Sequence, residues 1–264
     1  MRRPLGYEDV SLLSRRRSAI GRRREIDETL KRVSQTPHVV EPELLERIAD
    51  SVKATLQPVR RLPPTWILAC GLALICAAVA VAGAARAGFY GVEKMNSLQQ
   101  TLLFPVLTIL IAVAATEFVN AMIPGSLRKL SPSALLATSC VVLIGVLGLL
   151  FRDYRTEHFV SAGIICLLTG FLHAIPAGLL CGLMLRRGFA VNSVSAGLVA
   201  GTLAGLAGVG VLELHCANFE TAHLLVWHTA VVPVSGAAGA VLAWASRWQR
   251  GRIADESAHR NPMS

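Results

Sequence analysis

Residues 191–212 read VNSVSAGLVAGTLAGLAGVGVL and contain no charged side chain. A helix needs about 20 apolar residues to cross the hydrocarbon core of a bilayer, so this run predicts a transmembrane helix. Gly197, Gly201 and Gly205 recur at four-residue spacing and therefore lie on one face of that helix. Small residues in this arrangement allow a neighbouring helix to approach closely.

Five further apolar segments have a similar length, and they lie at about 66–85, 102–123, 134–151, 159–185 and 224–245. The chain is 53% hydrophobic, with a mean hydropathy of +0.52, which is typical of membrane proteins. A β-barrel would instead show alternating segments of about ten residues. The sequence thus predicts an all-α polytopic membrane protein, with a six-helix bundle over residues 65–246.

The distribution of basic residues predicts the orientation. Lysine and arginine gather before the first span, in the second and fourth loops, and after the last span, all of which lie on one side of the membrane. These residues are Arg60, Arg61, Arg128, Lys129, Arg186, Arg187, Arg247, Arg250 and Arg252. The net charge of +9 could indicate nucleic-acid binding, but the positive-inside bias of membrane proteins accounts for its placement better. We expect a membrane protein with a cytoplasmic N-terminus and a cytoplasmic tail over 247–264.

Residues 1–64 form a charged head with little apolar material for a core. We expect residues 1–40 to be disordered and 58–64, rich in proline, to connect the head to the first span. Between them, residues 42–57 predict an amphipathic helix whose apolar stripe consists of Leu45, Ile48, Val52 and Leu56. One helix cannot bury such a stripe alone, so it needs another helix of this chain, the membrane surface or a partner protein. The acidic residues around the stripe disfavour anionic lipid, and we therefore expect a protein partner.

Two titratable residues lie within the predicted spans. Glu117 is the one acid placed deep in a span, and His173 lies mid-span near Pro176. Intramembrane carboxylates are costly and often functional, so a small transporter or channel using Glu117 and His173 is one alternative. No Ser–His–Asp order, HExxH or DxD motif stands out, and we do not expect an enzyme.

The loop at 212–229, LELHCANFETAHLLVWHT, gathers the other candidates. Cys216 is flanked by His215, with Glu220 and His223 nearby, and a thiol beside a potential cation can be reactive or bind metal. Cys166 enters the fourth span from the same side, about 10 Å deep at 1.5 Å per residue. Spacing leaves three alternatives open: a disulfide, a shared soft metal ion, or two unconnected thiols.

Several motifs together resemble a known family. HCANFETAHLLVWHT, the following glycine-rich span and SRW (Ser246–Trp248) are similar to the end of NrsF-type membrane anti-sigma factors. CLLTGFLHAIPAGLLCGLMLRRG (166–188), IPGS (123–126) and RIADSVKATLQPVRRLPP (47–64) fit the same pattern. The resemblance covers roughly residues 41–248, with Ala217 and His228 departing from the usual residues.

The resemblance implies a function. The head would hold an extracytoplasmic-function sigma factor at the membrane, and heavy metal or oxidant would be sensed through the two cysteines that match Cys166 and Cys216. The expected partners are that sigma factor and membrane lipids, with no direct nucleic-acid contact and no small-molecule substrate. No resident cofactor is expected beyond transient soft-metal binding at Cys166 and Cys216, with His215, His223 and Glu220 as further metal-site candidates.

Overall fold

The structure is a computed structural model that describes residues 28, 31, 42–55, 63–123, 125–126, 128–154, 159–187 and 192–260. The chain divides into two compact units, Met1–Arg61 and Leu62–Ser264, and each is described by itself. Apart from Glu28 and Lys31, the segment 1–40 lies outside the described residues. So do Leu56 and most of the predicted connector.

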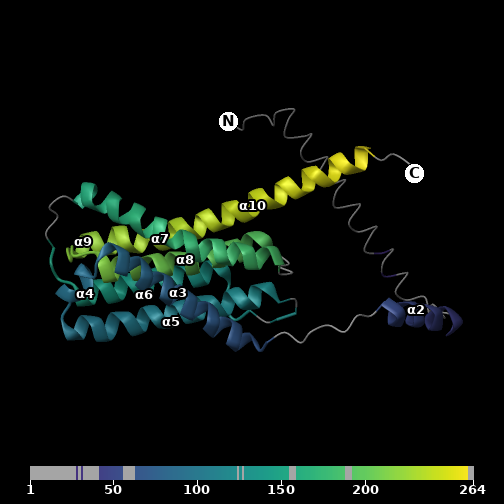
Figure 1. Cartoon of the computed structure of the whole chain (residues 1–264), viewed down its shortest axis with the longest axis horizontal. Coiled ribbons are helices and arrows are strands. Elements are labelled where there is room, and N and C mark those ends of the chain that lie inside the picture. The colour runs from purple at the N-terminus through teal and green to yellow at the C-terminus, as the bar shows by residue number, and fades with distance from the viewer. Residues whose placement is uncertain are drawn as a thin grey trace, which may run out of the picture. The chain divides into compact units, whose positions relative to one another are not determined.

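Helix α2, Pro42–Thr55, is the described helix of the first unit (Figure 1). Proline suits the first helical position because its missing N–H has no partner there in any case, and Glu43 follows in the first turn. Glu43 also pairs with Arg47 at 3.6 Å. On the apolar stripe, the side chains of Leu45 and Ile48 are 54% and 51% exposed, while the side chain of Val52 is not described.

The described part of the second unit contains six helices long and apolar enough to cross a membrane, as predicted. Figure 1 shows them as a bundle. They are α3 (Thr65–Ala87), α5 (Ser97–Met122), α6 (Pro132–Leu150), α7 (Phe159–Arg187), α8 (Ser193–His215) and α10 (Thr229–Arg260). No strand occurs among the described residues, so the all-α class is confirmed.

Two helix boundaries differ from the prediction. Helix α5 begins at Ser97 rather than near 102, because Asn96 and Gln99 form a capping box in which each side chain accepts a hydrogen bond from the other's backbone N–H. Helix α10 continues to Arg260, well beyond the predicted end of the last span at 245. Residues 247–260 of the predicted tail thus extend the last helix, and 261–264 lie outside the described residues.

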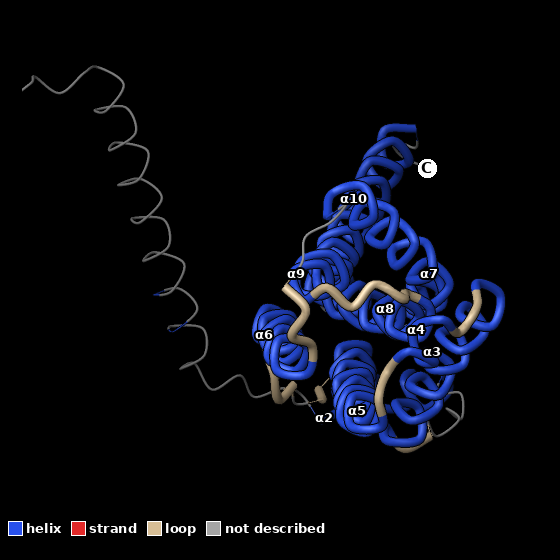
Figure 2. Tube along the Cα trace, turned by 90° about the vertical axis from the view of Figure 1, so that its left-hand side faces the viewer, coloured by secondary structure: helices blue, strands red, loops and turns tan. Residues whose placement is uncertain are grey.

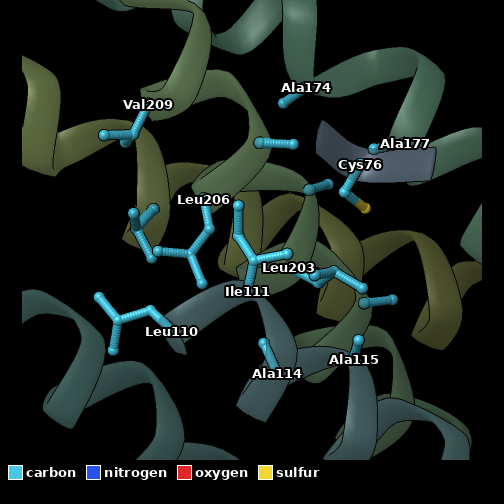
Figure 3. Close-up of a cluster of buried hydrophobic side chains, with 14 of the residues drawn as sticks. Cys76, Leu110, Ile111, Ala114, Ala115, Ala174, Ala177, Leu203, Leu206 and Val209 are labelled. Atoms are coloured by element: carbon cyan, nitrogen blue, oxygen red, sulfur yellow. The ribbon is translucent and has the colours of Figure 1, made fainter. Parts of the chain in front are cut away.

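Helix α8 is the central element of the bundle. In its most apolar window, 83% of the residues are buried, against at most half in the other five helices. It packs against α3, α5, α6, α7 and α10, and Figure 2 shows it among its neighbours. Figure 3 shows its Leu203 and Leu206 beside Ile111 of α5 in the main apolar core.

Glycines explain why α8 and α10 pack so closely. A Cβ added at Gly201 would collide with the backbone carbonyl oxygen of Ser235. One at Gly197 would meet the carbonyl of Gly239, and Gly239 in turn faces Gly197. The predicted close helix contact on this glycine face is therefore present, and α10 is the partner.

Short elements cover one end of the bundle, at the left in Figure 1. They are α4 (Tyr90–Lys94), α9 (Thr221–His223) and the π-helical turn η1 (Leu224–His228). The loop after α6 is tied to this end, because Thr221 donates its backbone N–H to Asp153 O and its hydroxyl to Phe151 O. We call this the α4–α9 end; it holds the site described next.

Candidate functional site

Four side chains from three separate segments meet at the α4–α9 end. Cys166 comes from the second turn of α7, and Cys216 is the C-cap residue that directly follows α8. His223 belongs to α9 and His228 ends the π-helical turn η1. One sulfur or nitrogen atom from each of the four lies within 4.8 Å of the others. We call these four residues the Cys–His cluster.

The sulfur atoms are the closest pair in the cluster. Cys166 Sγ lies 3.5 Å from Cys216 Sγ, and Cys216 Sγ lies 3.8 Å from Nε2 of His223. Cys166 is half-buried, whereas Cys216, His223 and His228 are buried. Spacing left three alternatives open. The short distance between the sulfur atoms favours a disulfide or a shared metal ion over two unconnected thiols.

A buried carboxylate orients His228. His228 Nδ1 lies 2.8 Å from Glu213 Oε1, and both side chains are fully buried. When the Glu213 carboxyl is ionised it can only accept a hydrogen bond, and Nδ1 of His228 is then the donor. The other ring nitrogen, Nε2, has no hydrogen-bond partner among the described residues. The ring therefore presents an unpaired nitrogen, held in position by Glu213.

The π-helical turn sets the direction of the two histidines. In an α-helix, with 3.6 residues per turn, side chains five positions apart point about 140° away from each other. A π-helical turn closes hydrogen bonds between residues five apart and so returns such a pair to one side. His223 and His228 accordingly meet edge to face, with ring centroids 5.3 Å apart. Turns of this kind are rare and frequently occur at functional sites.

Two glycines permit the close packing around the cluster. A Cβ at Gly91 of α4 would lie 2.6 Å from Glu213 O and 2.8 Å from Cys216 O. A Cβ at Gly163 of α7 would overlap the indole of Trp227, which belongs to η1. Glycine at 91 therefore lets α4 cover the end of α8, and glycine at 163 lets η1 lie against α7.

The Cys216 thiol lies outside the six helices and has a perturbed acidity. Its hydrogen bond to Cys166 and its burial raise the pKa, while His223 and His228 act in the opposite direction. The net effect keeps the proton on Cys216 at neutral pH. Any metal that bound the thiolate would have to displace that proton.

Two of the sequence candidates lie outside the cluster. His215 turns the other way: its Nδ1 lies 3.1 Å from Gly88 O and its ring packs near Tyr90. Glu220 sits at the start of α9, where its backbone N–H donates to the Asn218 side chain. Both are close to Cys216 in sequence, but neither supplies an atom to the group that could hold a metal.

Sequence reasoning did not assign His228 or the orienting role of Glu213. A spacing of five residues matches no face of an α-helix, so the histidine pair left no periodic signal. Glu213 follows the long apolar run of α8 and reads as the wet end of a span, yet it is 1% exposed. The sequence signal that could have identified it is an acid three residues before a cysteine, at the end of an apolar run.

Glu117 and His173, the two titratable residues within the predicted spans, do not form a site comparable to the Cys–His cluster. Glu117 of α5 is buried, with one carboxylate oxygen lacking a hydrogen-bond partner among the described residues. His173 of α7 bonds through Nδ1 to Thr169 O, one turn earlier in the same helix, and packs against Gly83. The histidine thus has the environment of an ordinary core residue. No described group of possible metal ligands includes either side chain.

Comparison with known proteins identifies the family. Neither the curated proteins nor the solved structures include a match. A family model described as "NrsF: Negative regulator of sigma F" matches residues 53–248, which is most of the chain and includes all six long helices up to Trp248. This protein therefore belongs to the NrsF family of negative regulators of a sigma factor.

Proposed function

We propose that this protein is a membrane anti-sigma factor whose α2 helix holds an extracytoplasmic-function sigma factor, and whose Cys166 and Cys216 sense heavy metal or oxidant. The proximity of the two sulfur atoms, one on α7 and one just after α8 and 3.5 Å apart, is the observation that carries the sensing part. Membership of a family of negative sigma regulators supports the anti-sigma part. The proposal includes no enzymatic reaction, small-molecule substrate or nucleic-acid contact.

The α2 helix is the proposed sigma-binding element. Leu45 and Ile48 lie on its apolar stripe, and each exposes about half of its side chain. A 14-residue helix is marginally stable in water unless its apolar face packs against something. A sigma factor that covered this stripe would gain apolar burial and would itself be kept from the polymerase.

The proposed orientation places the head in the cytoplasm, where sigma factors act. Arg128 and Lys129 lie in the loop between α5 and α6, and Arg186 and Arg187 end α7; both positions are at the end of the bundle opposite the α4–α9 end. The positive-inside rule then assigns that basic end, and both termini, to the cytoplasm of the inner membrane. The Cys–His cluster would face the other compartment, which in a diderm bacterium is the oxidising periplasm.

Two chemical events at the thiols could signal stress. Hydrogen peroxide could oxidise both thiols to a disulfide: the S–S bond forms, the O–O bond breaks, and the two electrons and two protons of the thiols reduce the peroxide to two water molecules. Alternatively, a soft metal ion could bind both sulfurs as thiolates with release of their protons. Either event changes the packing of α7, α8 and η1, and it would release the sigma factor only if the modified site favours a different packing of the bundle.

Co-purification from membranes tests the capture step. The full-length protein is expected to bring down an extracytoplasmic-function sigma factor, and Leu45→Asp with Ile48→Asp is expected to abolish capture. A matched control, Glu43→Gln with Arg47→Gln, removes the exposed ion pair on the opposite face of α2 and should leave capture intact. Capture unaffected by the aspartates would exclude α2 as the binding element.

A sigma-dependent reporter tests the sensing step. Cys166→Ser and Cys216→Ser should each abolish induction by cadmium or peroxide, while Cys70→Ser, at an exposed position on α3, should respond as wild type. Induction that persists in both cluster variants would refute thiol sensing. Ion flux in liposomes that Glu117→Gln removes would instead favour the transporter alternative.

A further inference from the structure

We propose that Cys166, Cys216, His223 and His228 form a four-ligand site for a divalent d10 cation, Zn²⁺ or Cd²⁺, and that Glu213 positions His228 for binding. The inference rests on the proposed function, since it names the ligand of the thiol pair that would do the sensing. It adds two histidines and a carboxylate to that pair, and it commits the site to one class of ion.

The distances suit a tetrahedral ion. Zinc binds sulfur at about 2.3 Å and imidazole nitrogen at about 2.0–2.1 Å, so neighbouring ligand atoms on a tetrahedron lie about 3.3–3.8 Å apart. The two sulfurs lie 3.5 Å apart, and Cys216 Sγ lies 3.8 Å from His223 Nε2. The widest separation in the cluster is within 4.8 Å, so about 1 Å of closure would complete the site.

An unpaired buried nitrogen points to a missing ligand. Nε2 of His228 is buried without a hydrogen-bond partner among the described residues. Leaving a buried polar atom unpaired is costly, so such atoms are uncommon and call for an explanation. An ion coordinated between the rings would satisfy Nε2 of His228 directly.

Glu213 has the position of a residue that orients a metal ligand. Histidine ligands commonly donate their second N–H to a carboxylate, which fixes the tautomer and turns the free nitrogen toward the metal. Glu213 and His228 show this arrangement at 2.8 Å. Glu213 Oε2 has no partner among the described residues, so the carboxylate is not explained by a wider hydrogen-bond network.

The π-helical turn supplies the second histidine. An α-helical register through Leu224–His228 would direct His228 away from His223, as argued above. The turn thus gives up regular helix geometry and brings both rings to the cysteines. The close approach of η1 to α7 at Gly163 holds the turn there. The backbone geometry of η1 therefore directs the two imidazole rings toward the two cysteines.

The donor set selects the ion. Thiolate and imidazole ligands in a tetrahedron suit zinc and its heavier congener cadmium, whereas calcium and magnesium require oxygen ligands. Two thiolates also balance the charge of a divalent cation, which a buried site requires. All four positions are filled by protein, as in structural or sensing sites and unlike catalytic ones. Cys166, the half-buried member, is the ligand through which an ion can enter.

Metal binding to the purified full-length protein tests this inference without a sigma factor. In detergent and under reducing conditions, we expect one Cd²⁺ per chain, with two sulfur and two nitrogen neighbours by X-ray absorption spectroscopy. His223→Ala and His228→Ala should weaken cadmium binding, measured by chelator competition, by more than about 100-fold. Glu213→Gln should weaken it about 10–100-fold while leaving two sulfurs and two nitrogens, as expected for a positioning residue.

His215→Ala is the matched control, because His215 adjoins Cys216 but bonds to Gly88 O; its affinity should equal that of wild type. Wild-type affinity in both His223→Ala and His228→Ala, or a spectrum without nitrogen, would overturn the four-ligand site. The wild-type spectrum decides the matter even if a variant fails to fold. Cadmium bound by all four ligands in a protein that captures no sigma factor would refute only the proposed function.

Discussion

Cys166 and Cys216 are separated by 50 residues in sequence, yet their sulfur atoms lie 3.5 Å apart. One thiol is half-buried on a helix and the other ends the most deeply buried helix of the bundle. An event at this pair therefore acts on the central helix directly. Because α8 packs against the other five long helices, a shift at its end is shared with the whole bundle.

Mild oxidation of the protein in membranes should cross-link Cys166 to Cys216. A disulfide has an S–S length of about 2.05 Å, so the sulfurs need to approach by about 1.5 Å. Peptide mapping by mass spectrometry under non-reducing conditions would identify the linked peptides. Cys70, exposed on α3, should remain unlinked within the chain and serves as the internal control. A dominant cross-link that involved any other cysteine would contradict the geometry of the pair.

Gly163→Ala should displace Trp227 and loosen the π-helical turn. The new methyl group would overlap the indole ring, and overpacking of this kind typically costs about 1–3 kcal/mol. We expect a lower thermal midpoint in detergent and a lower yield of the Cys166–Cys216 cross-link. Gly182→Ala lies on the same helix, where an added Cβ meets nothing within 4 Å, and should be neutral. Equal behaviour of the two variants would show that η1 does not depend on this contact.

Much of the fold follows from local sequence. Each of the six spans has about the length that a bilayer requires or more, so hydropathy finds them without knowledge of tertiary contacts. The start of α5 was missed because the decisive signal is a capping box at Asn96 and Gln99, which lies among polar residues before the apolar run. Helix α10 continues past Trp248 without an apolar face that hydropathy could detect.

The site could be predicted only in part. Topology places Cys166 and Cys216 toward the same end of the bundle but leaves their pairing open, and only the family resemblance implies that they act together. His228 required knowledge of the π-helical register, which no α-helical or strand period encodes. His215 was favoured by adjacency to Cys216, but neighbouring residues at a helix end point in different directions, and its ring turns to Gly88 O.

Gly91→Ala should expose Cys216 to reagents. The added Cβ would approach the carbonyl oxygens of Glu213 and Cys216, which are backbone atoms and cannot swing away. We therefore expect α4 to lift from the end of α8 and a polar maleimide to label Cys216 faster than in wild type, where the residue is 8% exposed. Gly145→Ala, whose Cβ would meet open space, should label at the wild-type rate. Unchanged labelling in Gly91→Ala would mean that α4 does not cover the thiol.

Gly201→Ala should destabilise the bundle at the contact between α8 and α10. Its Cβ would collide with the carbonyl oxygen of Ser235 and approach Cα of Gly236 at 2.8 Å, so the two helices would have to separate. Overpacking costs about 1–3 kcal/mol, whereas replacing a helical glycine with alanine in open space gains about 0.5–1 kcal/mol. The thermal midpoint in detergent should therefore fall in Gly201→Ala and hold or rise in Gly71→Ala, which has no neighbour within 4 Å of the added atom. Helix α10 continues directly from His228, so separating α10 from α8 should also move this proposed ligand. We therefore expect a lower cadmium affinity in Gly201→Ala and the wild-type affinity in Gly71→Ala. A midpoint in Gly201→Ala equal to that of the control would show that the glycine face does not set the distance between α8 and α10.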